Sequence, residues 1–148
     1  MIQRKQSLFL LAVAIIAILL FLMPFLTIDV GGESYGLTLL GGFKYGELIS
    51  AQIYIPFMLN VIVLLGSILT IFQFKKRVLQ YKLANLVALL SVFTTGMFFL
   101  LNFFKEPSVL VHFAPGAFFP LLGAVLAFLA GHYIKKDEQL VRSADRLR

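Results

Sequence analysis

The sequence contains no cysteine and few charged residues. The absence of cysteine excludes four-helix membrane enzymes that work through paired thiols, such as disulfide-generating quinone reductases and vitamin K epoxide reductases. It also excludes tetraspanin-like loops that are held by disulfides. Charged residues make up 14% of the 148 residues and hydrophobic residues 60%, whereas soluble domains average about 25% charged residues. We therefore expect lipid to be the solvent for much of this chain.

Four long apolar segments contain no Asp, Glu, Lys or Arg, and the mean hydropathy of the chain is +0.95. About 20 helical residues cross a hydrocarbon core of ~30 Å, and each segment is long enough to do so. The sequence thus predicts an all-α membrane protein with spans at residues 7–28, 53–74, 83–104 and 113–134. The first segment is expected to be a retained anchor, because it is too long for a signal peptide and offers no small-residue cleavage site.

The basic residues predict the orientation of these spans. All but Lys44 and Lys105 of the 13 Lys and Arg residues lie in the N-terminal segment, in the connection between the second and third spans, or after residue 134. The positive-inside rule then places both termini in the cytoplasm and residues 29–52 on the outer side. Orientation and anionic headgroups account for the net charge of +6, so the expected partner is the lipid bilayer and not nucleic acid.

The outer loop that follows the first span contains a candidate β-hairpin. Thr27 to Val30 and Tyr35 to Leu40 are rich in strand-forming residues and flank the turn sequence Gly31 to Ser34. An isolated two-stranded ribbon is marginally stable in water, so it would need support from the membrane, the helix ends or a partner. An irregular loop is the alternative.

Residues with catalytic or metal-binding chemistry do not form any recognisable pattern. The four predicted spans contain no ionisable residue that could form a proton relay or an ion path. His112 and His132 fall at opposite ends of the fourth span and cannot share a metal ion. The Ser-His-Asp, HExxH and glycine-rich phosphate-binding patterns are missing as well. We therefore expect no catalytic, cofactor-binding or metal-binding residues.

Small and polar residues at helical spacing indicate where the spans contact one another. Such residues let helices approach closely and form hydrogen bonds between them. The prolines near these segments are expected at helix ends or first turns, where proline is tolerated. The candidate packing residues are Asn60 and Ser67 on the second span, Ser91, Thr95 and Asn102 on the third, and Gly116, Gly123, Ala127 and Gly131 on the fourth.

The tail after residue 134 has the pattern of an amphipathic cytoplasmic helix. It places Leu140, Val141, Ala144 and Leu147 on one side and Glu138, Arg142 and Arg146 on the other. One interpretation is a helix that docks a cytoplasmic partner, and the other is a helix that lies on anionic lipid. The candidate docking residues are Glu138, Leu140, Val141, Arg142, Arg146 and Leu147.

The two ends of the chain resemble a known family. The opening Met1-Ile2-Gln3-Arg4 leads directly into an apolar helix, and the closing segment Ile134 to Arg148 has the charge pattern described above. Together they resemble the small Bacteroidota membrane proteins that form the family named domain of unknown function 4293. The likeness covers essentially the whole chain and is most specific at its ends. It implies a bacterial inner-membrane location and no particular catalysis.

Two hypotheses for function follow. The first is a non-enzymatic accessory or scaffold subunit that binds other inner-membrane proteins, or a second copy of itself, through its small-residue faces and its tail. The second is a small transporter or channel subunit in which Asn60, Asn85 and Asn102 line a polar path. A polar cavity at the middle of the bundle would favour the second hypothesis, and a filled bundle would favour the first.

Overall fold

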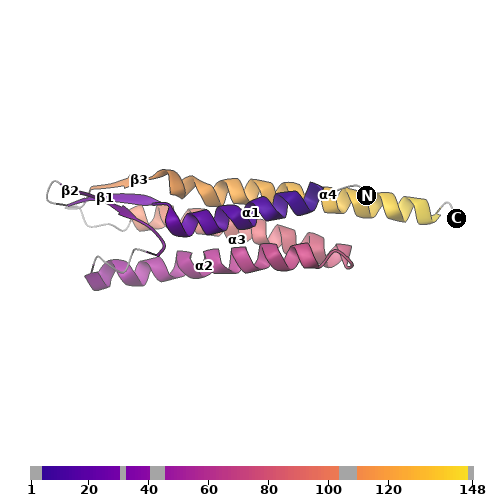
Figure 1. The fold of residues 1–148 in the computed structure, drawn as a ribbon, viewed down its shortest axis with the longest axis horizontal. Coiled ribbons are helices and arrows are strands. Elements are labelled where there is room, and N and C mark those ends of the chain that lie inside the picture. Colours follow the sequence, from indigo (N-terminus) through magenta and orange to yellow (C-terminus); the bar gives the residue numbers. More distant parts are fainter. Residues whose placement is uncertain (1–4, 31–32, 41–45, 104–109, 147–148) are drawn as a thin grey trace.

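The computed structural model describes residues 5–30, 33–40, 46–103 and 110–146; the side chains at positions 30, 33, 46–53, 101–103, 142 and 144–146 are outside this description. The described residues form four helices, three short strands and a 3-10 helix (Figure 1). In chain order they are α1 (Lys5–Leu22), β1 (Leu26–Val30), β2 (Glu33–Leu37), α2 (Gly46–Phe72), α3 (Arg77–Phe103), β3 (Leu110–Phe113), η2 (Pro115–Phe118) and α4 (Phe119–Arg146).

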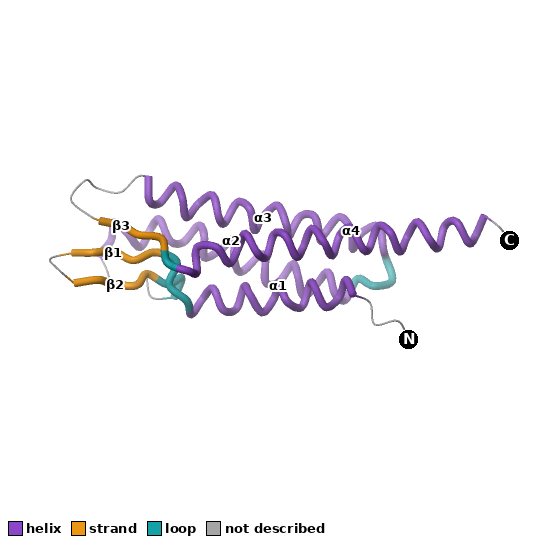
Figure 2. Tube along the Cα trace, turned by 90° about the horizontal axis from the view of Figure 1, so that it is seen from above, coloured by secondary structure: helices purple, strands orange, loops and turns teal. Residues whose placement is uncertain are grey.

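The helices form an up-and-down bundle in which α1 and α3 each pack against both α2 and α4. A short turn joins α2 to α3, and the backbone N–H of Lys76 donates to the carbonyl of Gln73 at 3.0 Å within it. Figure 2 shows the strands together at the opposite end of the bundle from this turn. We call the two ends the sheet end and the basic end, the latter because Lys75, Lys76 and Arg77 lie there.

A hairpin forms where the sequence predicts one, but its second strand is Glu33–Leu37 and not Tyr35 to Leu40. A third strand that the sequence did not indicate joins it. β1 lies between β2 and β3 and is antiparallel to both, with Ile28 opposite Tyr35 on one side and Val111 on the other. The fold is therefore mostly helical but not purely α. The third strand supplies the support that an isolated hairpin lacks, and it ties the α1–α2 connection to the α3–α4 connection.

The first helix ends at Leu22, although the apolar run continues to Ile28. Pro24 has no backbone N–H and disfavours helical geometry in the residue before it. Beyond it, Leu26 and Ile28 are buried in the core beneath the sheet. The last part of the predicted first span is therefore apolar because it belongs to a buried strand.

The other three helices also begin at positions that differ from the predicted spans. α3 begins at Arg77, six residues before the predicted third span. α2 begins at Gly46, within the predicted outer loop, so Pro56 lies well inside this helix and not in its first turn. α4 begins at Phe119, because Phe113 belongs to β3 and Pro115 starts η2. At its other end α4 continues to Arg146, so the predicted tail helix and the fourth span are one continuous helix.

The core consists of three clusters along the bundle. Beneath the sheet, the rings of Phe25 and Phe98 stack with their centroids 4.3 Å apart. The middle cluster combines small and branched side chains: Val13, Ala17, Val63, Val87, Ala88 and Ala127. The cluster at the basic end consists of Leu10, Ala84, Ala130 and Ile134. Alanines in the middle and basic-end clusters allow the helices to approach closely.

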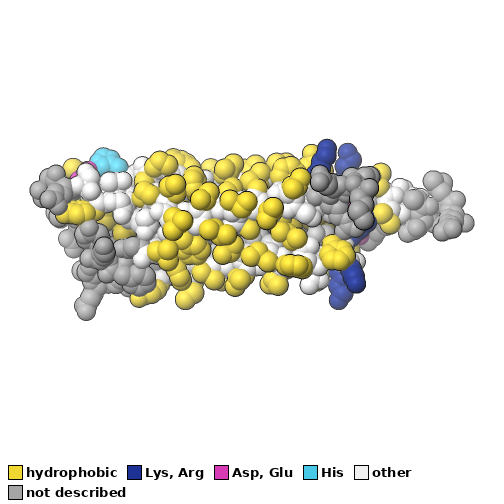
Figure 3. Space-filling model, in the orientation of Figure 1, with side chains coloured by type: hydrophobic (Ala, Val, Ile, Leu, Met, Phe, Trp, Pro, Cys, Tyr) yellow, Lys and Arg dark blue, Asp and Glu magenta, His cyan; other side chains and the backbone are white. Residues whose placement is uncertain are grey.

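The outer surface of the bundle is apolar over most of its length. Each of the four helices contains a segment long and apolar enough to cross a membrane, and only 28–44% of the residues in these segments are buried. Figure 3 shows a broad band of hydrophobic side chains, with Lys and Arg gathered at one end. Soluble monomers rarely expose contiguous apolar patches larger than a few hundred Å², so this surface is compatible with a membrane protein.

Candidate interaction site

Three contacts fasten α4 to the rest of the bundle at the basic end. The ring of Tyr133 stacks on Phe9 of α1 with centroids 5.6 Å apart, and the Lys135 ammonium lies 5.9 Å from the ring centroid of Tyr81 on α3. One turn further, the Arg77 guanidinium donates to the backbone carbonyl of Asp137 at 3.1 Å and lies 4.0 Å from its carboxylate. The position of α4 is thus fixed by side-chain contacts as far as Asp137.

Beyond Asp137, α4 projects past the other helices (Figure 1). The Leu140 and Val141 side chains on this projection are 60% and 45% exposed, and Glu138 is half-buried. Nine residues at ~1.5 Å per residue extend about 13 Å. Of the predicted docking residues, Arg142 and Arg146 lie in α4 with side chains outside the described part, and Leu147 lies outside the described residues altogether. We call residues 138–146 the projecting segment.

The small residues predicted on the fourth span differ in how tightly they are surrounded. Ala127 is completely buried against the middle cluster. A Cβ added at Gly131 would lie 2.8 Å from Oδ1 of Asn85, whereas at Gly123 its nearest neighbours would be 3.9 Å away. Gly116 lies in η2, and a Cβ there would overlap the Pro24 carbonyl. At Gly116 and Gly131, neighbouring atoms therefore leave no room for a Cβ, whereas Gly123 has room for one.

Most of the predicted polar packing residues form hydrogen bonds within their own helices. Ser67 donates to the carbonyl of Leu64, Ser91 to that of Val87 and Thr95 to that of Ser91, at 2.8–3.1 Å. Such bonds satisfy the hydroxyl donors without a partner on another helix. Asn60 is different, because its amide Nδ2 donates to the Ala17 carbonyl of α1 at 2.9 Å. The side chain of Asn102 lies outside the described part of α3.

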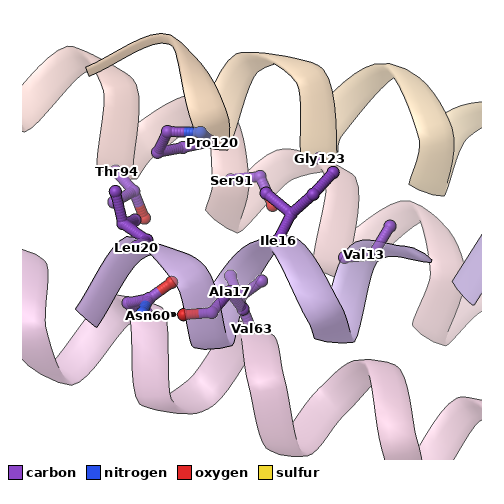
Figure 4. A pocket seen from close by; sticks show the side chains of 10 residues that line it. All are labelled: Val13, Ile16, Ala17, Leu20, Asn60, Val63, Ser91, Thr94, Pro120 and Gly123. Atoms are coloured by element: carbon purple, nitrogen blue, oxygen red, sulfur yellow. Dashed lines mark hydrogen bonds between the residues drawn. The ribbon is translucent and has the colours of Figure 1, made fainter. Parts of the chain in front are cut away.

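A small cavity lies beside Asn60, between α1, α2, α3 and the start of α4 (Figure 4). Its volume is about 10 Å³, and it is lined mainly by apolar side chains together with Asn60, Ser91 and Thr94. A space of roughly 10–15 Å³ holds a single water molecule. Asn85 does not line this cavity but faces Gly131 at the contact between α3 and α4. The structure therefore does not bring Asn60 and Asn85 together around one space.

Gln80 is a buried polar residue that sequence reasoning missed. Its side chain is 0% exposed, and its Nε2 donates at 3.1 Å to the carbonyl of Thr70, in the last turn of α2. Helix C-termini leave carbonyls without an intrahelical partner, so Gln80 caps α2 from α3. Its Oε1 has no hydrogen-bond partner within the described residues. A single polar residue in the mixed sequence Val78 to Tyr81 gives no signal of this role.

At the sheet end, the polar side chains of Ser34 and His112 lie beside the Asp29 carboxylate. Ser34 donates to one carboxylate oxygen at 2.5 Å, and the His112 Nε2 lies 3.4 Å from the other. The His112 side chain is largely exposed. Within the described residues, no group of three His, Cys, Asp or Glu side chains could hold a metal ion.

Comparison with known proteins identifies the family. The family model described as Domain of unknown function (DUF4293) matches residues 2–147, and the chain therefore belongs to this family. No curated protein and no solved structure matches the sequence.

Proposed function

We propose that this member of the domain of unknown function 4293 family is a non-enzymatic accessory or scaffold subunit of the bacterial inner membrane. Its four helices cross the bilayer, with the basic end and both termini in the cytoplasm and the sheet on the outer side. The apolar exterior of the bundle and the segregation of Lys and Arg at one end support this placement.

The single observation that carries the proposal is the continuation of α4 beyond the bundle. α4 has 28 residues and is about 42 Å long, which exceeds a hydrocarbon core of ~30 Å. A helix that lies on lipid must run in the plane of the membrane surface. The projecting segment instead continues the axis of α4 (Figure 2). Its Leu140 and Val141 side chains are exposed and would face the cytoplasm in the proposed orientation, which favours docking of a protein over lipid binding.

The bundle interior supports a scaffold more than a transporter. The cavity beside Asn60 has room for about one water molecule, and the described Ser and Thr side chains on α2 and α3 donate to carbonyls of their own helices. A polar path would require connected polar groups that point into an open space. Partner binding would then rest on the ends and outer faces of the bundle.

The proposal is tested by photo-crosslinking in living cells. A photoreactive amino acid is placed at Leu140, at Val141 or at Gln139, which lies two residues before Val141 and so on the other side of the helix. We expect a discrete protein adduct from positions 140 and 141 and little from 139. Leu140→Gln with Val141→Gln should release the same protein on purification in mild detergent, whereas Gln139→Ala should retain it.

The opposite result would refute docking through the projecting segment. Docking is refuted if the adducts form with equal yield at all three positions, or if the only adducts are to lipid. Both variants leave the Arg77 and Asp137 contact in place, so the bundle itself should accumulate at wild-type levels in each case. Reduced accumulation of the double variant alone would indicate a role in folding and would count against the proposal.

A further inference from the structure

The basic end carries a cleft that the proposed function does not use. It has a volume of about 390 Å³ and is lined by Lys76, Arg77, Val78, Leu79 and Lys82. All five residues belong to the segment 76–82 at the start of α3, so the cleft is shallow and open on its outer side. Three of the five lining residues are cationic and none is acidic, so the charge of the cleft is suited to an anion.

The cleft opens at the end of an apolar stripe on α3. Leu79, Lys82, Leu86, Leu89 and Phe93 follow one another at intervals of three or four residues, and all five are exposed. This spacing places them along one face of the helix. This face is exposed and is apolar except for Lys82. Lys82 lies one turn after Leu79, where the stripe begins.

The cations in the cleft differ in how they are held. Arg77 is positioned by the Asp137 carbonyl and lies 4.0 Å from the Asp137 carboxylate, whereas Lys76 and Lys82 are exposed. A lysine can lay its methylene chain along apolar surface while its ammonium group reaches into the polar layer. Lys82 has apolar neighbours for that arrangement in Leu79 and Leu86, which lie one turn before and after it on the same face.

We propose that this cleft binds the phosphate headgroup of an anionic phospholipid, whose acyl chains lie along Leu86, Leu89 and Phe93. The order of a charged group followed by long apolar surface matches a phospholipid that stands parallel to the bundle axis. An acidic peptide bound at the cleft would leave the stripe uncovered. The inference rests on the proposed insertion of the bundle in a bilayer.

Native mass spectrometry of the purified full-length protein tests the site. Phosphatidylglycerol and phosphatidylcholine with the same acyl chains are titrated separately, and the dissociation constant of the first lipid adduct is measured. Anionic lipid binding gains about fivefold from each nearby Lys. Lys76→Gln with Lys82→Gln should therefore weaken phosphatidylglycerol binding by about 30-fold and leave phosphatidylcholine binding unchanged.

Matched controls separate a defined site from general attraction. Lys5→Gln with Lys136→Gln removes the same charge from the same end of the bundle, at exposed positions outside the cleft, and should change the phosphatidylglycerol constant by less than about threefold. Lys76→Arg with Lys82→Arg keeps the charge and should retain binding. Equal losses in the two glutamine variants, or equal affinity of the wild type for both lipids, would overturn the site.

Insertion itself is measured first, by resistance of the wild-type protein in vesicles to alkaline extraction. A protein that is extracted would contradict the proposed function and the lipid site together. A protein that resists extraction but shows no preference for phosphatidylglycerol would contradict the lipid site alone. Because Lys76 and Lys82 are exposed, their substitution removes no core contact, and unchanged thermal stability of the variants is expected.

Discussion

Gly116→Ala should destabilise the protein, because this glycine lies where the α3–α4 connection crosses the end of α1. A Cβ at this position would overlap the Pro24 carbonyl oxygen and approach the Met23 carbonyl oxygen to 3.2 Å. Both neighbours are backbone atoms, which cannot move aside by rotating a side chain. The N–H of Gly116 also donates to the Pro24 carbonyl at 3.0 Å, so a shift that relieves the overlap would stretch this hydrogen bond.

The expected cost is about 2 kcal/mol, because overpacking typically costs about 1–3 kcal/mol. For a chain of this size, that corresponds to a decrease of roughly 4–8 °C in the midpoint of thermal unfolding. Circular dichroism of the protein in mild detergent measures the midpoint. A midpoint equal to that of the wild type would contradict the expectation.

Gly96→Ala is the matched control, because the chemical change is the same and the surroundings are open. Gly96 lies inside α3, and a Cβ there would meet no atom within 4 Å. Replacing glycine by alanine inside an exposed helix gains about 0.5–1 kcal/mol. The midpoint of Gly96→Ala should therefore rise slightly while that of Gly116→Ala falls. Equal shifts in the two variants would refute the role assigned to the Gly116 and Pro24 contact.

Two further predictions concern topology and the bundle interior. Since the chain has no cysteine, single cysteines introduced at Gly32 and Ser143 can be labelled specifically in intact cells. Gly32→Cys should react with an impermeant reagent, and Ser143→Cys should react only after the membrane is opened. The reverse pattern would overturn the proposed orientation. Ala127→Leu should lower the midpoint of thermal unfolding by an amount that corresponds to about 1–3 kcal/mol, because Ala127 is completely buried. Val125→Leu, at an exposed position of the same helix, should leave the midpoint nearly unchanged, and equal effects would show that Ala127 is not packed inside.

The existence of the four helices could be predicted from the apolar runs, but their ends could not. The run up to Ile28 contains both the end of α1 and most of β1, since a buried strand and a membrane helix are both apolar. The four residues of β3 are too few to show alternation, and their pairing with β1 depends on contacts more than 80 residues away in sequence. The hairpin was predictable because the glycine-containing turn lies between two strand-forming segments.

The candidate packing residues were predictable as a set, whereas their separate roles were not. Gly116, Gly123 and Gly131 look alike in sequence, yet a Cβ would overlap the Pro24 backbone at the first, make ordinary contacts with Ile16 and Ser91 at the second and press on the Asn85 amide at the third. A local pattern identifies the face of a helix that carries small residues, but the partner on that face is set by the whole fold. The same reasoning explains why Asn60 reaches another helix while Ser91 does not.

The continuity of α4 agrees with the composition of its second half. Residues 132–148 contain neither glycine nor proline, so nothing in the backbone favours a break between the fourth span and the tail. The amphipathic pattern alone left open whether the tail lies on lipid or stands away from it. An unbroken helix favours the second arrangement, because turning into the membrane plane would require such a break.

The contacts at the two ends of α4 explain how the projecting segment can be held in a defined position. At the sheet end, the N–H groups of Ala114 and Gly116 donate to the carbonyls of Phe25 and Pro24, which fixes the start of the helix relative to α1. At the basic end, Arg77 binds Asp137 immediately before the projection. Between these points the helix is held by buried alanines and Gly131 against α1 and α3. A projection fixed in this way loses little conformational entropy on binding, and so the sheet at one end of the bundle contributes to recognition proposed at the other.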